Sequence, residues 1–294
     1  MESIRTVRVA TDFSHHASDA ARRGGHLGRA LGLEPGRLVH VLDRHGVRSV
    51  RDLLPWIGEL DERMEEHAKQ KLQRLSSELE KETGFHFDTE VLEGRVEEEF
   101  LASAKPGELI VIGGRGEHSV AEVTFGSTAE RIVRKSQRPV LVVKRPYVKP
   151  YRRVVVPVDF SDDSRAALLR ARELAPDAEL YVLHAWPPLP REGEGFAGIS
   201  DEDVKRYARE VREKAEEQLD ALLKDCGIED NAVQRLMQHG YAASFIWQQA
   251  RGVGADLVVL GKHGHSRLAD WLIGSVTTHV LNNCDTDILV ARAE

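Results

Sequence analysis

The sequence predicts a tandem α/β protein, in which two domains of one fold follow each other along the chain. Short apolar runs alternate with segments whose apolar residues recur at helical spacing. Strands separated by helices form parallel sheets with right-handed crossovers. The whole pattern occurs twice, and each copy carries a glycine-rich turn between an apolar run and a helix. The length of 294 residues is enough for two domains of ordinary size.

The duplication can be followed by residue number. The stretch at residues 7–14 returns at 154–161, so that Asp12 matches Asp159 after 147 residues. The glycines of the later turn return after 148 residues. We therefore predict an N-terminal domain over residues 1–145, a proline-containing linker over 146–150 and a C-terminal domain over 151–294.

Each repeat reads as alternating strands and helices. In the first repeat, Ser14 is a suitable N-cap for the helix that follows the first strand. We expect strands at residues 5–10, 37–42, 85–92, 108–112 and 140–143, and further helices at 60–83, 96–104 and 128–135. The second repeat keeps this order, with a long helix at 201–224. The connections at 43–58 and 186–199 are expected to be mobile loops.

The most specific motif is a glycine loop of the form G-x2-G-x9-G-S, which occurs once in each repeat. Its residues are Gly113, Gly116, Gly126 and Ser127 in the first repeat and Gly261, Gly264, Gly274 and Ser275 in the second. Glycine lets the backbone approach a ligand closely, and a helix that begins there presents unpaired N–H groups to an anion. The motif therefore indicates a phosphate-binding loop. It lacks the Gly-Lys-Ser/Thr of a Walker A motif, and its late position disfavours a dehydrogenase.

Composition excludes several classes of protein. A net charge of −7 argues against a general nucleic-acid binder, and no apolar run is long enough for a membrane helix. The first residues lead directly into a strand, so we expect no signal peptide. The two cysteines, Cys226 and Cys284, form no CxxC motif and favour a reducing, cytoplasmic setting. The histidines at 15, 16, 263 and 265 lack zinc-helix spacing, and we predict no metal site made by the protein alone.

The pattern resembles the universal stress protein family in its tandem two-domain form, over almost the whole chain. The resemblance rests on the Asp-x-Ser that follows each first strand, on His40 and His184 near the ends of the second strands, and on the two glycine loops. It implies that each domain is a doubly wound fold with a five-stranded parallel sheet, in the order 3-2-1-4-5, and helices on both faces. It also implies pairing of the last strand with its counterpart in a partner domain, which the two halves could make within one chain.

The resemblance further implies binding of ATP or ADP, with Mg²⁺ on the phosphates. Asp12 and Asp159 would face the adenine and ribose, since a carboxylate accepts hydrogen bonds and the adenine amino group donates them. Val41 and Ala185 would touch the base. The ribose and phosphates would lie against Ile112, Gly113, Gly116, Gly126, Ser127 and Thr128 in the first repeat, and against Leu260, Gly261, Gly264, Gly274, Ser275 and Val276 in the second. Thr11, Pro157 and Val158 beside the aspartates are also expected among the nucleotide-binding residues, with Thr11 and Pro157 acting through the shape of the backbone.

No nucleophile–base arrangement or paired-carboxylate motif accompanies these loops, so we predict at most slow ATP hydrolysis. The leading hypothesis is a cytoplasmic stress-response protein whose nucleotide-bound state is read by a protein partner. One alternative is an ATPase or other nucleotide-processing enzyme of the same fold. Another is an interaction module in which only one site works. Further assembly into a homodimer stays open, and neither nucleic acid nor membrane is an expected partner.

Overall fold

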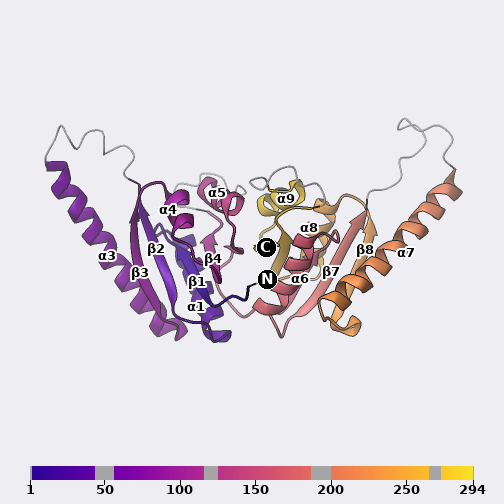
Figure 1. Cartoon of the computed structure of the whole chain (residues 1–294), viewed down its shortest axis with the longest axis horizontal. Helices are drawn as coiled ribbons and strands as arrows, with labels where there is room; N and C mark the ends of the chain where they lie inside the picture. Colours follow the sequence, from indigo (N-terminus) through magenta and orange to yellow (C-terminus); the bar gives the residue numbers. More distant parts are fainter. Residues whose placement is uncertain (1, 44–55, 116–124, 187–199, 265–272, 294) are drawn as a thin grey trace. The chain divides into compact units, whose positions relative to one another are not determined.

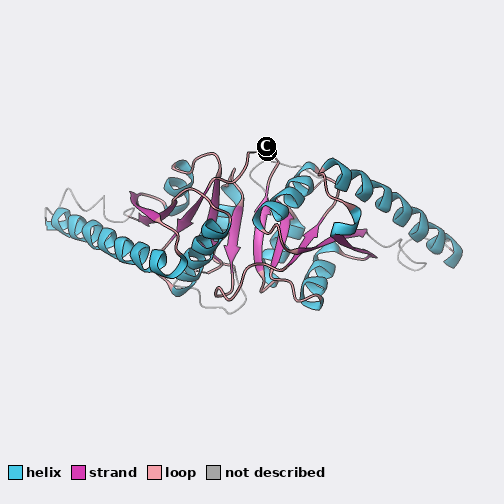
Figure 2. Cartoon of the chain, turned by 90° about the horizontal axis from the view of Figure 1, so that it is seen from below, coloured by secondary structure: helices cyan, strands magenta, loops and turns pink. Residues whose placement is uncertain are grey.

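The computed structural model describes residues 2–43, 56–115, 125–186, 200–264 and 273–293 (Figure 1). The chain divides into two compact units, one of Met1–Pro150 with Asp285–Val290 and one of Tyr151–Cys284 with Ala291–Glu294. In each unit the strands lie between helices (Figure 2). The α/β class and the duplication are therefore as the sequence predicts.

The elements of the first repeat follow the predicted alternation. They are β1 (Thr6–Ala10), α1 (His15–Ala30), β2 (Gly36–Leu42), α3 (Trp56–Thr83), β3 (Phe87–Glu93), α4 (Val96–Ala102), β4 (Glu108–Gly113), α5 (Ser127–Lys135) and β5 (Val140–Val143). Ser14 caps α1, because its hydroxyl oxygen accepts a hydrogen bond from the backbone N–H of Ala17 at 3.2 Å. The predicted cap is confirmed.

The second repeat has the same succession. Its elements are β6 (Arg153–Pro157), α6 (Asp162–Leu174), β7 (Glu179–Trp186), α7 (Asp201–Asp225), the short 3-10 helix η1 (Asp230–Ala232), β8 (Val233–His239), α8 (Ala242–Gly252), β9 (Leu257–Gly261), α9 (Ser275–Asn283) and β10 (Asp287–Ala291).

Two boundaries of the predicted mobile connections were wrong. Residues 56–58 belong to α3, which begins at Trp56. Trp186 is the last residue of β7 and is 7% exposed, because its ring packs at the end of a strand instead of entering the loop. Asp43 is described and follows β2, and residues 44–55 and 187–199 lie outside the described residues.

The sheet order confirms the expected fold. Hydrogen-bonded neighbours run β3-β2-β1-β4-β5 in the first repeat and β8-β7-β6-β9-β10 in the second, which is the order 3-2-1-4-5 in each. The pairs within the β1–β5 set and those joining β6 to β7 and β9, and β7 to β8, are parallel. The carboxyl ends of parallel strands therefore meet at one edge of each sheet, and connections from those ends form the candidate site.

Strand β10 completes the first unit. It pairs antiparallel with β5, with Leu289 opposite Leu141. The buried carboxylate of Asp287 accepts hydrogen bonds from the backbone N–H groups of Lys144 and Arg145, at 2.8 and 3.2 Å. The same carboxylate lies 3.2 Å from Nε of Arg23 on α1. Two backbone donors and one guanidinium thus compensate the cost of burying this charge.

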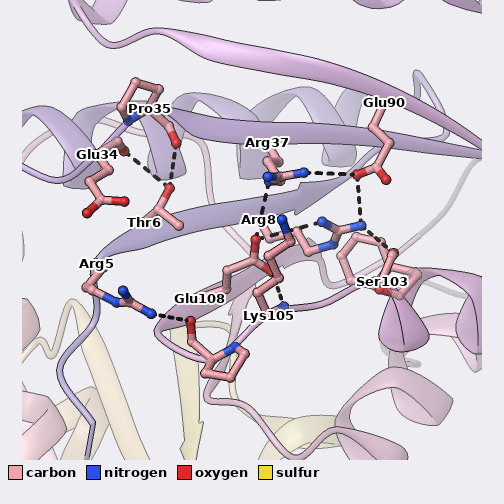
Figure 3. Close-up of polar contacts among 12 residues, drawn as sticks. Arg5, Thr6, Arg8, Glu34, Pro35, Arg37, Glu90, Ser103, Lys105 and Glu108 are labelled. Carbon is pink, nitrogen blue, oxygen red and sulfur yellow. Dashed lines mark hydrogen bonds and ion pairs between the residues drawn. The ribbon is translucent and has the colours of Figure 1, made fainter.

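A second buried ionic cluster lies on the first unit's sheet (Figure 3). Arg8, in the middle of β1, is fully buried and donates to Glu90 at 3.1 Å and to the hydroxyl of Ser103. Its Nη1 lies 3.8 Å from Glu108, which is itself 1% exposed, and Arg37 lies 3.6 Å from the same carboxylate. The charges of two arginines and two glutamates are therefore neutralised within the fold.

Candidate functional site

An unusual turn follows the first strand of the first repeat. Phe13 adopts a positive φ of 65°, a conformation that a bulky side chain rarely takes. The turn is held by side chains of its neighbours: the hydroxyl of Thr11 accepts from the N–H of Phe13, and the carboxylate of Asp12 accepts from the N–H of Ser14, both at 3.0 Å. Such strain persists only where surrounding contacts determine it and is frequent at functional sites.

The second repeat builds the same turn after β6. Phe160 has a φ of 67°, and the carboxylate of Asp159 accepts from the N–H of Ser161 at 3.1 Å and from its hydroxyl at 2.6 Å. One oxygen of Asp159 is therefore held in place by two donors. Asp159 is half-buried, whereas Asp12 is exposed.

A histidine on the neighbouring strand supports each turn. Nδ1 of His40 lies 2.8 Å from the carbonyl oxygen of Thr11, and Nδ1 of His184 lies 2.8 Å from that of Val158. The same rings pack on the strained phenylalanines, with centroids 4.5 Å apart for Phe13–His40 and 4.4 Å for the second pair. Burial lowers the pKa of His184, although the Val158 carbonyl and Asp159 act in the opposite direction. A neutral imidazole that donates from Nδ1 fits this arrangement.

The two histidines served only as markers in the sequence, and the two phenylalanines were not singled out. The signal that could have found them is the exact repetition of Asp-Phe-Ser at both strand ends. The histidines directly precede the two residues that we predict to contact the base. Val41 follows His40 and is buried, and Ala185 follows His184 and is half-buried.

The first glycine of each loop is needed for close packing inside the protein. A Cβ on Gly113 would come within 2.9 Å of the backbone of His16, and one on Gly261 within 2.9 Å of the backbone of Asp163. Each strand end thus lies directly against the first turn of the first helix of its repeat, α1 or α6. Contact of these two glycines with a ligand stays a prediction.

Backbone hydrogen bonds close the two ends of each loop. Gly114 donates to the carbonyl of Val143 at 2.8 Å and accepts from the N–H of Gly126 at 3.0 Å. In the second repeat Lys262 makes the same two bonds, to Ala291 at 2.7 Å and from Gly274 at 3.0 Å. Residues far apart in each loop are thereby brought to one point beside the strand end.

The middle glycine lies beside the first-strand aspartate in the second repeat. A Cβ on Gly264 would stand 2.6 Å from Oδ2 of Asp159, closer than any side chain tolerates. Two predicted site residues that are 105 positions apart are therefore neighbours at the carboxyl edge of the sheet. The equivalent glycine of the first repeat, Gly116, lies outside the described residues.

Each loop ends at a helix whose first N–H groups are bare of side-chain caps. Gly126 caps α5 and Gly274 caps α9, and neither cap forms a side-chain hydrogen bond. Ser127 and Ser275, the first residues of these helices, are exposed, and the following residues, Thr128 and Val276, are half-buried. A helix N-terminus of this kind favours an anion through its N–H groups and its dipole.

The remaining predicted residues form the floor of this edge. Ile112 and Leu260 end the apolar runs of β4 and β9 and are 3% exposed each. Thr11 and Val158 are buried, and Pro157 is half-buried at the end of β6. These positions supply apolar and backbone surface beside the aspartates.

Two further observations concern metals and membranes. Among residues 2–43, 56–115, 125–186, 200–264 and 273–293, no group of three or more His, Cys, Asp or Glu could hold a metal ion. Within those same ranges no helix combines the length and apolarity needed to span a bilayer.

Both cysteines are buried, and burial raises the pKa of the Cys226 thiol.

Comparison with known proteins gives a consistent result. The family model of the universal stress protein family matches residues 3–144 and again 150–292. A universal stress protein of Mycolicibacterium smegmatis is 26% identical over 298 residues, covering 97% of this chain and 96% of that protein. The crystal structure of a universal stress protein from Archaeoglobus fulgidus, 19% identical, covers 98% of each chain with a TM-score of 0.66. A universal stress protein crystallised in complex with cAMP is 28% identical over half of this chain (49%, and 98% of its own), with a TM-score of 0.34.

Proposed function

The chain belongs to the universal stress protein family, and we propose that it is a stress-response module in which each repeat binds ATP or ADP at the carboxyl edge of its sheet. The base and ribose would lie near the Asp-Phe-Ser turn, against Val41 or Ala185. The phosphates would lie on the glycine loop and on the first turn of α5 or α9.

The observation that carries this proposal is the contact between Gly264 and Asp159. The loop glycine has no side chain at the one place where a side chain would strike the aspartate, 2.6 Å away. The carboxylate is fixed by Ser161 and can accept a hydrogen bond, as the amino and hydroxyl groups of an adenine nucleoside require. The uncapped N–H groups of α9, at the other end of the same loop, suit the phosphates.

The residues present fit a nucleotide whose charge is met by main-chain donors. The loop's own hydrogen bonds fix the starts of α5 and α9, so that the N–H groups of these first helical turns, which have no side-chain cap, need little reorganisation when an anion arrives. Mg²⁺ would then bind chiefly to the phosphate oxygens and to water, as this ion prefers. A member of the same family forms a complex with cAMP, which carries the same base and ribose.

Binding, not turnover, is the proposed activity. The two aspartates lie at the end of the site assigned to the base, and each already accepts hydrogen bonds from its own turn. Neither is placed to activate a water at a terminal phosphate. We propose that a protein partner recognises the nucleotide-loaded form.

The experiment is to purify the intact chain without denaturation, release its small molecules with acid and identify them by mass spectrometry. The proposal expects ATP or ADP in the extract, or tight uptake of added ATP. A chain that carries no adenine nucleotide and takes up none would contradict it. Turnover with Mg²⁺ well above about 1 s⁻¹, the low end of typical enzymes, would instead favour the enzyme alternative.

A further inference from the structure

The two glycine loops differ by one buried carboxylate. Asp163, in the first turn of α6, is 1% exposed and stands four residues after Asp159. The residue four positions after Asp12 in the first repeat is His16. The loop position that faces this site is also different: His263 in the second repeat corresponds to Arg115 in the first.

Asp163 uses one carboxylate oxygen to bind the second loop and the other to bind the segment after β10. Its Oδ2 accepts from the backbone N–H of His263 and lies beside Nδ1 of the same residue, both at 2.9 Å. Its Oδ1 accepts from the backbone N–H of Ala293, after β10, at 2.8 Å. Hydrogen bonds to an ionised acceptor are about twice as strong as neutral ones. The carboxylate therefore fastens the loop, the helix and the chain's last residues together.

Two other contacts of the loop are shared by both repeats. The first glycine packs against the helix backbone in each, at Gly113 and at Gly261. The following residue donates to the end of the last strand in each, from Gly114 and from Lys262. Among the described residues of the two loops, the carboxylate occurs in the second repeat, since an imidazole at 16 and a guanidinium at 115 cannot form this pair. The second repeat also has a bond from the Thr277 hydroxyl to the Gly261 carbonyl at 2.9 Å, where the first repeat has Ala129.

The imidazole of His263 is fixed by this arrangement. Its side chain is 8% exposed, and its Nε2 is buried with no hydrogen-bond partner among the described residues. A buried polar atom in that state is costly, so strong bonds elsewhere on the residue must hold it there. His263 directly precedes Gly264, which lies against Asp159.

We propose that Asp163 is a positioning residue of the second nucleotide site: through His263 it holds Gly264 beside Asp159 before any nucleotide is bound. The effect on nucleotide affinity rests on the proposed function, whereas the positioning of the loop by Asp163 does not. A loop that is already ordered loses less conformational freedom on binding. The second site therefore binds nucleotide more tightly than the first, and the two repeats fill in sequence.

The first arm of the test needs no nucleotide. Amide hydrogen exchange of the intact chain is compared with that of Asp163→Asn, His263→Asn and His263→Gln, in peptides covering residues 257–264 and 287–293. Asparagine places its amide N–H where the histidine Nδ1 stood, whereas glutamine places it one bond farther out. We expect exchange at least about tenfold faster in Asp163→Asn and His263→Gln, the size of one lost charge-assisted bond, and near-native exchange in His263→Asn.

Unchanged exchange in Asp163→Asn would overturn the proposal. An equal rise of the exchange rate in the peptide that covers β6 would also overturn it, because that pattern indicates a general loss of stability and not the release of the loop.

The second arm measures ATP binding by calorimetry. Asp163→Asn is expected to weaken the tighter of two sites about tenfold and leave the weaker one unchanged. The matched graft, His16→Asp with Arg115→His, is expected to bring the first site toward the affinity of the second. Equal affinities in the intact chain, or a tighter site untouched by Asp163→Asn, would overturn the inference. If the intact chain binds no nucleotide, the proposed function fails, and the exchange arm alone judges the positioning role.

Discussion

The Asp-Phe-Ser turns of the two repeats are nearly identical, whereas the two sheets differ in their middle. The Asp-Phe-Ser turns share a positive φ, a histidine contact of 2.8 Å and a ring separation that differs by 0.1 Å. In the sheet, the buried Arg8 and the half-buried Arg37 of the first repeat correspond by register to Val155 and Tyr181 in the second. The side chains at these core positions therefore differ between the repeats, while the backbone geometry of the Asp-Phe-Ser turns is the same.

This difference separates what the fold requires from what the site requires. A parallel sheet can be filled by an ionic cluster or by apolar side chains, provided that charges are paired. A strained phenylalanine is not demanded by a sheet of either kind. Its presence in both repeats is therefore best explained by the position it gives to the neighbouring aspartate.

The largest expected effect is on stability, and it comes from a substitution in the ionic cluster of the first unit. Arg8→Val introduces the residue of the second repeat but removes the buried cation beside Glu108, which is 1% exposed and keeps the half-buried Arg37 at 3.6 Å. We expect a loss of about 3 kcal/mol of unfolding free energy in that unit, because the buried carboxylate loses one of its two charge partners. Urea unfolding followed by hydrogen exchange, read separately in β1 and β6, measures it.

The double variant Arg8→Val with Glu108→Gln is the control for charge. It removes both charges and keeps an acceptor for the N–H of Lys105, and so should recover part of the loss. An Arg8→Val chain as stable as the parent would show that the cluster is not a coupled unit.

The next effect tests a feature that the repeats share. Gly113→Ala and Gly261→Ala each drive a Cβ to 2.9 Å from helix backbone, which must shift. We expect each to cost about 1–3 kcal/mol, as overpacking does, and the two costs to be similar. Gly252→Ala is the control, since nothing lies within 4 Å of the added carbon. Thermal unfolding of the three variants is the measurement. Unchanged stability in Gly113→Ala and Gly261→Ala would contradict the packing role of these glycines.

A smaller effect concerns binding. Gly264→Ala pushes against a carboxylate that Ser161 holds with two hydrogen bonds, so the aspartate must move or the loop must retreat. We expect ATP affinity at the second site to fall at least about tenfold, about 1.4 kcal/mol, with little change in stability. Isothermal calorimetry against ATP tests this, with Gly252→Ala again as the control. Undiminished binding at both sites would place the ligand elsewhere.

The smallest effect is a pH dependence. Because burial lowers the pKa of His184 in the folded protein below its ordinary value of 6.5, the fold favours the neutral ring. Its stabilisation is therefore complete above about pH 6.5 and declines as the pH falls through the folded pKa. His184→Asn keeps a donor toward the Val158 carbonyl and does not titrate. We expect the parent to lose more stability than this variant between about pH 7 and pH 5 in urea titrations; parallel curves would contradict the assignment.

Much of the fold, and the gathering of the candidate residues at the carboxyl ends of the strands, could be predicted from local pattern. Apolar runs gave the strands, the Asp-x-Ser and glycine motifs marked the carboxyl ends, and their repetition gave two domains. Residue 13 could not be predicted in this way, because a phenylalanine with positive φ contradicts its own propensity and depends on His40 from another strand. The burial of Arg8 could not be predicted either, because its partners Glu90, Ser103 and Glu108 come from three other segments of the chain. The Asp163–His263 pair joins residues 100 positions apart, a distance at which sequence spacing carries no signal.

The measurement that tests the account most directly is the number of ATP molecules bound per chain, by calorimetry on the intact protein stripped of nucleotide. The account predicts two, with the second-repeat site lost first in Gly264→Ala. A stoichiometry of zero would contradict it, because both glycine loops would then be features of packing alone.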